Sequence, residues 1–509
     1  MRRPGVRRRG ELPPAALLLA LSAAACGRGE PAVDRQPVGD PATAAEAVGT
    51  GGGDALPAAV AEAADPAPAG DGWTLLHRLP DPTGEIALLL DGDAGAHAAW
   101  IGATAEGRVL VHATLSTTGA ERVDTLLRGW AALDTPRLLA GADGVLVLFA
   151  GDSAAAGRPV RLYATRAGTG GLPGPPGVVS AAQDRIGPIT TVLDREGSPV
   201  IAWPTAQESR LAFGLEPLRP PTPVPGCCGH GLALARDADG SIVLAGAVDG
   251  AGGRPPGLET MSILPADDAS FEVPSSSPAA GSGGEGGFAA TGLHRAPGVF
   301  VIYCGGAERC EAMRVWRHGA TPGEAPAILA RTATVRLVAA APTRDDRLWA
   351  AWVGEDSVHA VRTRARGDVS SPGPVIPFPL PRSVVDPVAL ALAAQEGALD
   401  LVLAGREPDG LTLWRRRVLP ALSVTPPAMP PPLDQDAVLQ LAVDDAGDPV
   451  AGALVRALGH TMTTDARGVV GLPMPAGLRT DTLEVAVEAQ GYAPLHVTFH
   501  GSRPEGRLP

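Results

Sequence analysis

The chain has 509 residues, of which 45% are apolar and 19% charged, so it is long enough for one large domain with accessory domains and can bury a sizeable core. Its formal net charge of −13 argues against the basic surface with which proteins neutralise nucleic-acid phosphates, and no nucleic-acid partner is expected. The 65 glycines and 52 prolines interrupt long helices and favour many short strands joined by turns.

Residues 1–25 have the pattern of a signal peptide. Five arginines within residues 2–9 precede an apolar run over 14–25, which is too short to cross a bilayer. The segment 21–26, LSAAAC, resembles a bacterial lipobox, in which the cysteine follows the cleavage site and carries a diacylglycerol. The resemblance implies that Cys26 is lipidated and that a membrane is a partner through this anchor. Ordinary cleavage at an Ala-x-Ala site is the alternative.

Residues 26–72 are then predicted to be a lipidated cysteine followed by a disordered tether. The tether is rich in Ala, Gly, Pro, Asp and Glu and lacks aromatic residues, so it buries too little apolar surface to offset its ordering entropy. Such a segment holds the following domain away from the membrane. The chain is therefore expected to be exported and lipid-anchored in the bacterial cell envelope, facing the periplasm or the cell surface.

A β-hairpin motif recurs about every fifty residues through the body of the chain. Each copy is an apolar strand, a polar turn and a second apolar strand, and a third strand usually follows. Polar stretches between copies are long enough for a fourth strand. The seven copies span 86–100, 137–149, 190–203, 232–245, 288–303, 336–352 and 389–404.

This repeat predicts an all-β fold, a propeller of about seven blades over residues 73–420. A lone blade of three or four strands leaves both faces exposed, whereas blades stacked in a ring cover one another. The segment 73–77 is expected to add an outer strand to the last blade and so close the ring. The turns at 194–197 and 237–240 carry Asp and Gly, which tolerate the backbone conformations of tight turns.

The repeat resembles the units of sialidase-like (BNR-type) propellers, although the family's Asp-box, Ser-x-Asp-x-Gly-x-x-Trp, is not complete in any copy. The resemblance implies that catalysis would need a tyrosine nucleophile, an acid and three arginines. The chain has only Tyr163, Tyr303 and Tyr492, none in a suitable place. Paired carboxylates such as Asp345-Asp346 and Asp444-Asp445 are interpreted as solvated turns. No catalytic residue is assigned.

Four cysteines remain after Cys26: Cys227, Cys228, Cys304 and Cys310. An even number in an exported chain predicts disulfides, and four cysteines allow three connectivities. A hairpin over 304–310 would bring Cys304 beside Cys310, and the other two would form a vicinal disulfide or stay reduced. The rival interpretation is a soft-metal site of the vicinal pair with His230, which lacks a fourth ligand. No metal and no cofactor is assigned.

Residues 421–436 carry five prolines and predict a stiff linker, and residues 502–509 are a tail. The unit between them, residues 437–501, resembles the carboxypeptidase regulatory-like domain, which implies a small prealbumin-like β-sandwich without peptidase activity. The residues that carry the resemblance are Asp444, Gly447, Pro449, Val450, Gly452, Ala453, Val455, Thr464, Asp465, Gly468, Leu472, Ala489, Gly491 and Tyr492.

These features together predict a membrane-anchored envelope lipoprotein that is not an enzyme. It would bind or scaffold a protein or glycan ligand as a non-catalytic module. The alternative is a glycosidase-type, sialidase-like enzyme that uses the propeller channel. Carboxylates and arginines converging on the channel would favour the enzyme.

Overall fold

The computed structural model describes residues 72–500 apart from loop segments and single positions at 80–81, 91–94, 117–118, 142–143, 153–159, 168–174, 184, 206–207, 216–220, 225–229, 249–256, 264–274, 278–286, 306–309, 321–323, 396, 427–435 and 476–481. The predicted signal peptide, Cys26, the tether through residue 71, Cys227, Cys228, most of the linker and the tail lie outside the described residues. Within the described ranges no helix is long and apolar enough to cross a bilayer.

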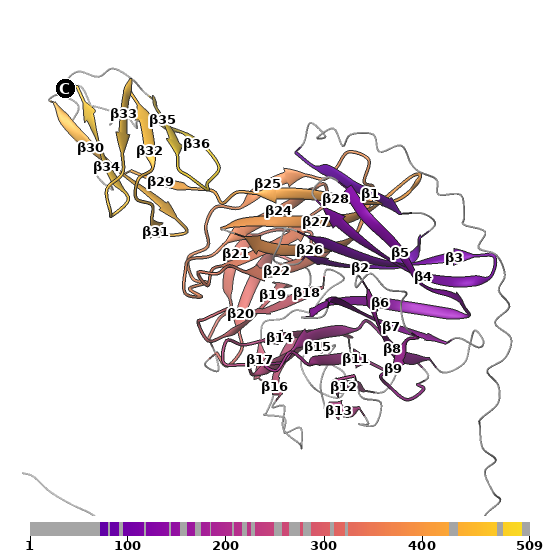
Figure 1. The fold of residues 1–509 in the computed structure, drawn as a ribbon. Coiled ribbons are helices and arrows are strands. Elements are labelled where there is room, and N and C mark those ends of the chain that lie inside the picture. The colour runs from indigo at the N-terminus through magenta and orange to yellow at the C-terminus, as the bar shows by residue number, and fades with distance from the viewer. Residues whose placement is uncertain are drawn as a thin grey trace, which may run out of the picture. The chain divides into compact units, whose positions relative to one another are not determined.

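The described residues form nine four-stranded antiparallel sheets (Figure 1). The first four are β2 (Pro82–Leu90), β3 (Ala96–Thr104), β4 (Gly107–Ser116), β5 (Gly119–Trp130); β6 (Ala132–Gly141), β7 (Gly144–Asp152), β8 (Arg161–Ala167), β9 (Gly177–Val178); β10 (Thr190–Leu193), β11 (Pro199–Pro204), β12 (Ser209–Phe213), β13 (Thr222–Val224); and β14 (His230–Arg236), β15 (Ile242–Val248), β16 (Gly257–Ile263), β17 (Ser275–Ser277).

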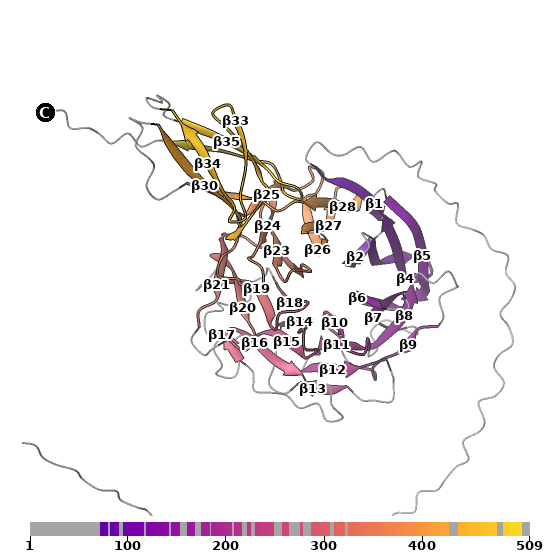
Figure 2. The same cartoon turned by 60° about the vertical axis from the view of Figure 1, so that its left-hand side comes forward.

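The next three sheets are β18 (Phe288–Gly292), β19 (Val299–Gly305), β20 (Ala312–Arg317), β21 (Ala327–Arg331); β22 (Leu337–Pro342), β23 (Leu348–Val353), β24 (Ser357–Arg362), β25 (Ile376–Pro379); and β26 (Asp386–Gln395), β27 (Ala398–Glu407), β28 (Gly410–Val418) with β1 (Thr74–Leu79). Their innermost strands contact one another in the order β2, β6, β10, β14, β18, β22, β26, and β26 contacts β2. Figure 2 shows the ring that results. The predicted all-β fold and its propeller architecture are confirmed.

The second strand of each sheet is buried because neighbouring sheets cover both of its faces. All six residues of β23 are buried. Each pair of neighbouring sheets shares a hydrophobic core: Trp100 and Leu115, for example, pack with Leu413 between the first and last sheets of the ring. Burying an aliphatic side chain of this size stabilises the fold by about 2 kcal/mol, so the ring holds together through cores between its sheets.

The ring is closed by β1, which pairs with β28 from Thr74↔Arg415 to Leu79↔Leu411, as the sequence predicts. The indole Nε1 of Trp73, fully buried, donates a hydrogen bond to the Pro379 carbonyl oxygen at 2.8 Å. The last sheet therefore combines strands from both ends of the propeller sequence, which prevents the ring from opening at the chain ends.

A buried carboxylate reinforces this closure. Glu407 accepts hydrogen bonds from Ser383 Oγ at 2.6 Å, Thr412 Oγ1 at 2.8 Å and Trp414 Nε1 at 3.2 Å, and Arg78 of β1 pairs with it at 2.9 Å. Burial raises the pKa of Glu407, but the hydrogen bonds from Ser383, Thr412 and Arg78 together lower it below its usual value. The carboxylate thus links the closing strand to the sheet that it completes.

The hairpin turns at one end of the ring also join neighbouring sheets. Asp194 acts as a turn former, accepting from the Ser198 N–H at 2.7 Å. Asp237 instead accepts from the Gly298 N–H of the next sheet, and Asp346 accepts three backbone N–H groups of residues 294–296 at 2.9 Å each. Asp346 is 6% exposed, so its interpretation as a solvated turn residue is wrong.

The last two sheets form the C-terminal unit and share one hydrophobic core, in which Leu441, Val455, Leu472 and Val485 are buried. The first sheet contains β29 (Ser423–Thr425), β30 (Ala437–Asp445), β31 (Asp448–Pro449) and β34 (Val469–Met474), and the second contains β33 (His460–Thr463), β32 (Leu454–Ala457), β35 (Thr482–Glu488) and β36 (Leu495–His500).

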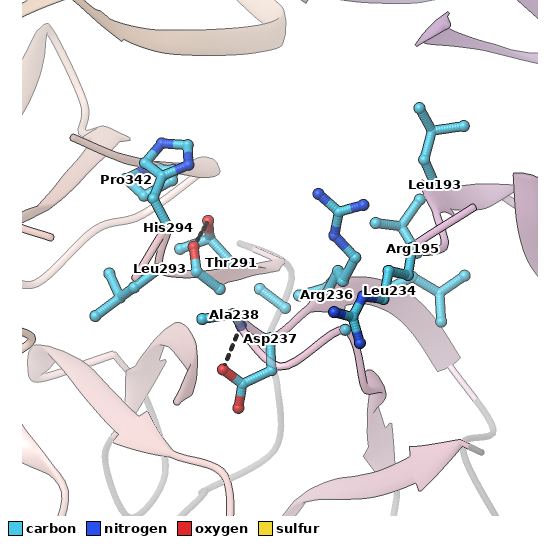
Figure 3. Close-up of a pocket in the computed structure, with 15 residues that line it drawn as sticks. Leu193, Arg195, Leu234, Arg236, Asp237, Ala238, Thr291, Leu293, His294 and Pro342 are labelled. Atoms are coloured by element: carbon cyan, nitrogen blue, oxygen red, sulfur yellow. Dashed lines mark hydrogen bonds between the residues drawn. The ribbon is translucent and has the colours of Figure 1, made fainter. Parts of the chain in front are cut away.

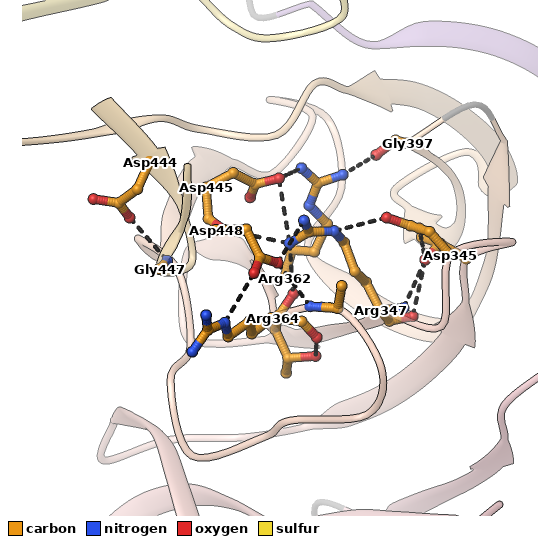
Figure 4. A network of polar contacts seen from close by, with 12 residues as sticks. Asp345, Arg347, Arg362, Arg364, Gly397, Asp444, Asp445, Gly447 and Asp448 are labelled. Atoms are coloured by element: carbon orange, nitrogen blue, oxygen red, sulfur yellow. Dashed lines mark hydrogen bonds and ion pairs between the residues drawn. The ribbon is translucent and has the colours of Figure 1, made fainter. Parts of the chain in front are cut away.

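An ion-pair network joins the turn between β30 and β31 to strands β23 and β24 of the propeller (Figure 4). Asp445 pairs with Arg362 and, at 3.4 Å, with Arg347, whereas Asp448 pairs with Arg347 at 2.7 Å and Arg364 at 2.8 Å. Asp445 is 2% exposed, so its interpretation as a solvated turn residue is also wrong. The turn between β30 and β31, whose Asp and Gly residues predict an exposed surface turn, therefore contacts the propeller.

We predict that Glu407→Ala lowers the free energy of unfolding by about 2–3 kcal/mol, because the Ser383 hydroxyl and the Arg78 guanidinium lose their partner. Thr412 and Trp414 would each keep one of two acceptors. Urea unfolding followed by tryptophan fluorescence measures the change. Glu121→Ala, at an exposed position of the outer strand β5, serves as the matched control and should change stability by less than about 0.5 kcal/mol. Equal effects of the two variants would contradict the role given to Glu407.

We also predict that Asp445→Ala destabilises the protein by about 3–5 kcal/mol, because it leaves the buried guanidinium groups of Arg347 and Arg362 without their shared carboxylate. The neighbouring substitution Asp444→Ala removes one exposed turn bond to the Gly447 N–H and should cost about 1 kcal/mol. Urea unfolding compares the two, and a smaller loss for Asp445→Ala than for Asp444→Ala would refute this assignment.

Candidate functional site

A cavity of about 470 Å³ lies inside the ring at the end where the innermost strands begin. Most of the residues that line it have apolar side chains, and its charged side chains are Glu85, Arg137 and Arg406. They come from β2, β6 and β27, far apart in the chain. An apolar cavity with a few converging polar groups is the usual form of a binding or active site.

Irregular backbone on neighbouring innermost strands positions these side chains. The pairing of β2 with β3 is interrupted between Pro82 and Ile86, and that of β6 with β7 between Asp134 and Arg137. Thr135, inside the second interruption, has a φ of 46°, which a β-branched residue rarely adopts. Bulges and strained residues of this kind are common beside active sites, where they direct side chains away from the regular pleat.

The Glu85 carboxyl is the electrostatically perturbed group of the cavity. Glu85 keeps an exposed surface, but partial desolvation by the surrounding sheets raises the pKa of its carboxyl above the usual value. The negative charge of Asp134 raises this pKa further, whereas Arg137 and the Thr135 N–H oppose the shift. Glu85 therefore keeps its proton to a higher pH than an ordinary glutamic acid.

Arg137 supplies the positive charge beside Glu85. Its Nε donates a hydrogen bond to the carbonyl oxygen of Ile189, just before β10, so the side chain reaches from the second sheet of the ring to the third. Burial lowers the pKa of Arg137, and Glu85 partly restores it. Arg406, also in the cavity wall, lies 3.9 Å from Asp386 and is about half exposed.

The arrangement brings a proton donor, a second carboxylate and a fixed cation to one end of the channel. Two carboxyl groups in unequal environments are the groups with which glycoside hydrolysis is catalysed. Among the residues that the structure describes, no three His, Cys, Asp or Glu side chains are grouped as metal ligands. A carboxyl with a raised pKa beside a guanidinium can supply acid–base chemistry.

The residues chosen from the sequence lie elsewhere. Cys304 and Cys310 form the predicted disulfide, with Cα atoms 5.3 Å apart, across the loop between β19 and β20. Tyr163 stacks on Phe149 in a core between sheets, and Tyr303 is 2% exposed. Cys26, Cys227 and Cys228 fall outside the described residues.

Sequence reasoning missed Glu85, Asp134 and Arg137. Glu85 lies directly before the first predicted hairpin, Arg137 begins the second, and Asp134 lies three residues before it, so all three are near the start of their repeats. Equivalent places in neighbouring repeats of a ring meet at one end of the channel. The position of these residues in the repeat could therefore have indicated the site. The two bulges that orient the side chains cannot be predicted from the hydrophobic pattern.

Three solved structures of carbohydrate-active enzymes are similar to this chain in fold. An α-L-arabinanase from Penicillium chrysogenum, complexed with arabinobiose, is 10% identical, with a TM-score of 0.37 and coverage of 67% of this chain and 96% of that one. An α-L-arabinofuranosidase from Fusarium graminearum is 12% identical, with a TM-score of 0.34 and coverage of 68% and 97%. The polysaccharide lyase Uly1 is 9% identical, with a TM-score of 0.41 and coverage of 67% and 90%.

At these identities the similarity concerns the fold alone and transfers no residue role. No protein-family model and no curated protein matches the chain. The expectation of a non-catalytic binding or scaffold module that is not an enzyme does not agree with these similarities in fold, which include an arabinanase, an arabinofuranosidase and polysaccharide lyases. The case for this chain rests on its own channel residues.

We predict that Asp134→Asn lowers the pKa of Glu85, because it removes a neighbouring negative charge, and that Arg137→Gln raises it, because it removes a positive one. Carboxyl-carbon NMR of protein labelled at glutamate follows the titration. A Glu85 titration that neither substitution moves would disprove the electrostatic description of the site.

Proposed function

We propose that the protein is a carbohydrate-active enzyme of the glycosidase type, with its active site in the channel cavity. In this proposal the Glu85 carboxyl donates its proton to the glycosidic oxygen as the bond between that oxygen and the anomeric carbon breaks. Asp134 is the second carboxylate and stabilises the positive charge that develops on the sugar. Water then adds to the anomeric carbon and gives a proton to the Glu85 carboxylate. Arg137 holds the substrate beside them. The observation that carries the proposal is that Glu85 and Arg137 line one cavity, with Asp134 near enough to raise the pKa of Glu85.

The carboxylates favour this chemistry over that of a sialidase. A sialidase-like mechanism would need a tyrosine in the channel, and none of the chain's three tyrosines lines the cavity that contains Glu85. The apolar side chains of the wall support binding of the sugar faces, which carry C–H groups, while the charged groups act on the glycosidic oxygen. A cavity of about 470 Å³ accommodates a ligand of a few sugar rings.

We further propose that the seven sheets of the ring are seven blades of one propeller and that the C-terminal unit is a prealbumin-like sandwich of the carboxypeptidase regulatory-like kind. Lipidation at Cys26 would anchor the enzyme in the bacterial cell envelope. The order of β30 to β36 and the resemblance in the 437–501 segment support the sandwich. The lipobox-like segment 21–26 supports the anchor.

The test is release of reducing ends from a panel of polysaccharides, including arabinan, and of nitrophenol from a panel of nitrophenyl glycosides by the full chain. On the substrate that is cleaved, Glu85→Gln should lower kcat by about 100-fold or more, because a positioned general acid contributes about 10²–10⁴-fold. Activity should fall as pH rises through the raised pKa of Glu85, because only the protonated carboxyl donates.

Glu121→Gln is the matched control and should retain full activity, because this residue lies on the outer strand β5. Circular dichroism and melting temperature establish that both variants are folded. If the Glu85→Gln variant cleaved the substrate as fast as the unmodified protein, the active site would not be the cavity that contains Glu85. Failure of the folded protein to cleave any member of the panels would count against the proposed activity.

A further inference from the structure

A second cavity, of about 570 Å³, lies at the opposite end of the ring, where the innermost strands end. It is formed by the ends of β10, β14, β18 and β22 and the hairpin turns that follow them. The cavity that contains Glu85 is lined instead by Leu337 and Val338, at the start of β22, whereas this one is lined by Pro342 at its end. The two cavities are therefore distinct sites on one channel.

Basic side chains surround this second cavity. Arg195 and Arg236 lie on one side of it and His294 on the other (Figure 3). One NH group of Arg236 donates to the Asp194 carbonyl oxygen of the preceding sheet at 2.7 Å, which uses one of five donors and fixes the guanidinium plane. The Arg195 stem packs over the turn of the next sheet, where a Cβ on Gly240 would lie 3.2 Å from Arg195 Cδ.

The carboxylates near these arginines are engaged by backbone groups. Both oxygens of Asp237 accept from the Gly298 N–H, at 2.8 and 3.0 Å, and one also accepts from the Ala238 N–H at 2.6 Å. Asp239, which lies close enough to Arg195 to feel its charge, accepts from the Ser241 N–H at 2.8 Å. Backbone donors thus hold both carboxylates in place, and the guanidinium groups of Arg195 and Arg236 line the cavity in a chain of net charge −13.

We propose that this cavity binds the anionic group, a carboxylate or sulfate, of an acidic saccharide. Two guanidinium groups held by contacts to neighbouring sheets offer the planar, charge-assisted donors that match such oxyanions. That the ligand is a saccharide rests on the proposed function, whereas the requirement for negative charge rests on Arg195 and Arg236. The protein then binds acidic sugar at one end of the channel and cleaves sugar at the other.

Calorimetry on the full chain tests this proposal with trigalacturonic acid and its neutral methyl ester. The protein should bind the acid and not the ester, and inorganic sulfate should compete. The double substitution Arg195→Gln with Arg236→Gln should weaken binding of the acid tenfold or more. Arg195→Gln alone, which preserves the contact of Arg236 with Asp194, should weaken it in the same direction. Arg128→Gln on the outer strand β5 should leave it unchanged.

All binding is measured in the Glu85→Gln variant, so that cleavage does not consume the probe. Equal binding of acid and ester, binding that survives the double substitution in a folded protein, or no binding of the acid would each overturn the proposal. Cleavage is assayed separately in protein with Glu85 intact. Loss of anion binding with cleavage retained refutes this inference alone, and anion binding without any cleavage refutes the proposed function alone.

Discussion

The structure depends on one constraint: a four-stranded sheet with two apolar faces must be covered on both. Each sheet of the ring meets this constraint by sharing a core with the sheet before it and the sheet after it. The first and last sheets do so through Trp100 and Leu413. Closure by β1 makes this arrangement continuous, since the strand comes from the other end of the propeller sequence. The Glu407 cluster then holds the closing strand in its register.

Closure of the ring also creates the candidate site. Glu85 and Asp134 belong to neighbouring sheets, and Arg137 reaches the third sheet through the carbonyl oxygen of Ile189. These groups meet because the innermost strands of all sheets run round one axis. The cores between sheets make the ring rigid. The bulges in β2 and β6 interrupt the regular strand pairing next to Glu85 and Arg137 and change the direction of these side chains. The second strand of each sheet therefore contributes mainly to stability, whereas the innermost strands carry the side chains of the candidate site.

The hydrophobic pattern predicted most of this frame. The hairpins, the closing strand before residue 80 and the Cys304–Cys310 disulfide follow from local alternation, turn residues and cysteine spacing. The site did not, because the pKa of Glu85 depends on Asp134 and Arg137, about fifty residues away and brought close by irregular backbone. The burial of Asp445 was missed for a related reason: its partners Arg347 and Arg362 belong to another domain, and a turn sequence gives no sign of them. The absence of a recognisable catalytic motif thus led to the wrong expectation of a non-catalytic module.

The central claim is that Glu85 and its neighbours form the place where a sugar chain is bound for cleavage. A crystal structure of the Glu85→Gln variant with a bound oligosaccharide tests this claim most directly. The account predicts a sugar in the cavity at the start of the innermost strands, with a glycosidic oxygen within hydrogen-bond distance of side chain 85 and with Arg137 in contact with the sugar. An oligosaccharide bound elsewhere on the protein, with this cavity empty, would contradict it.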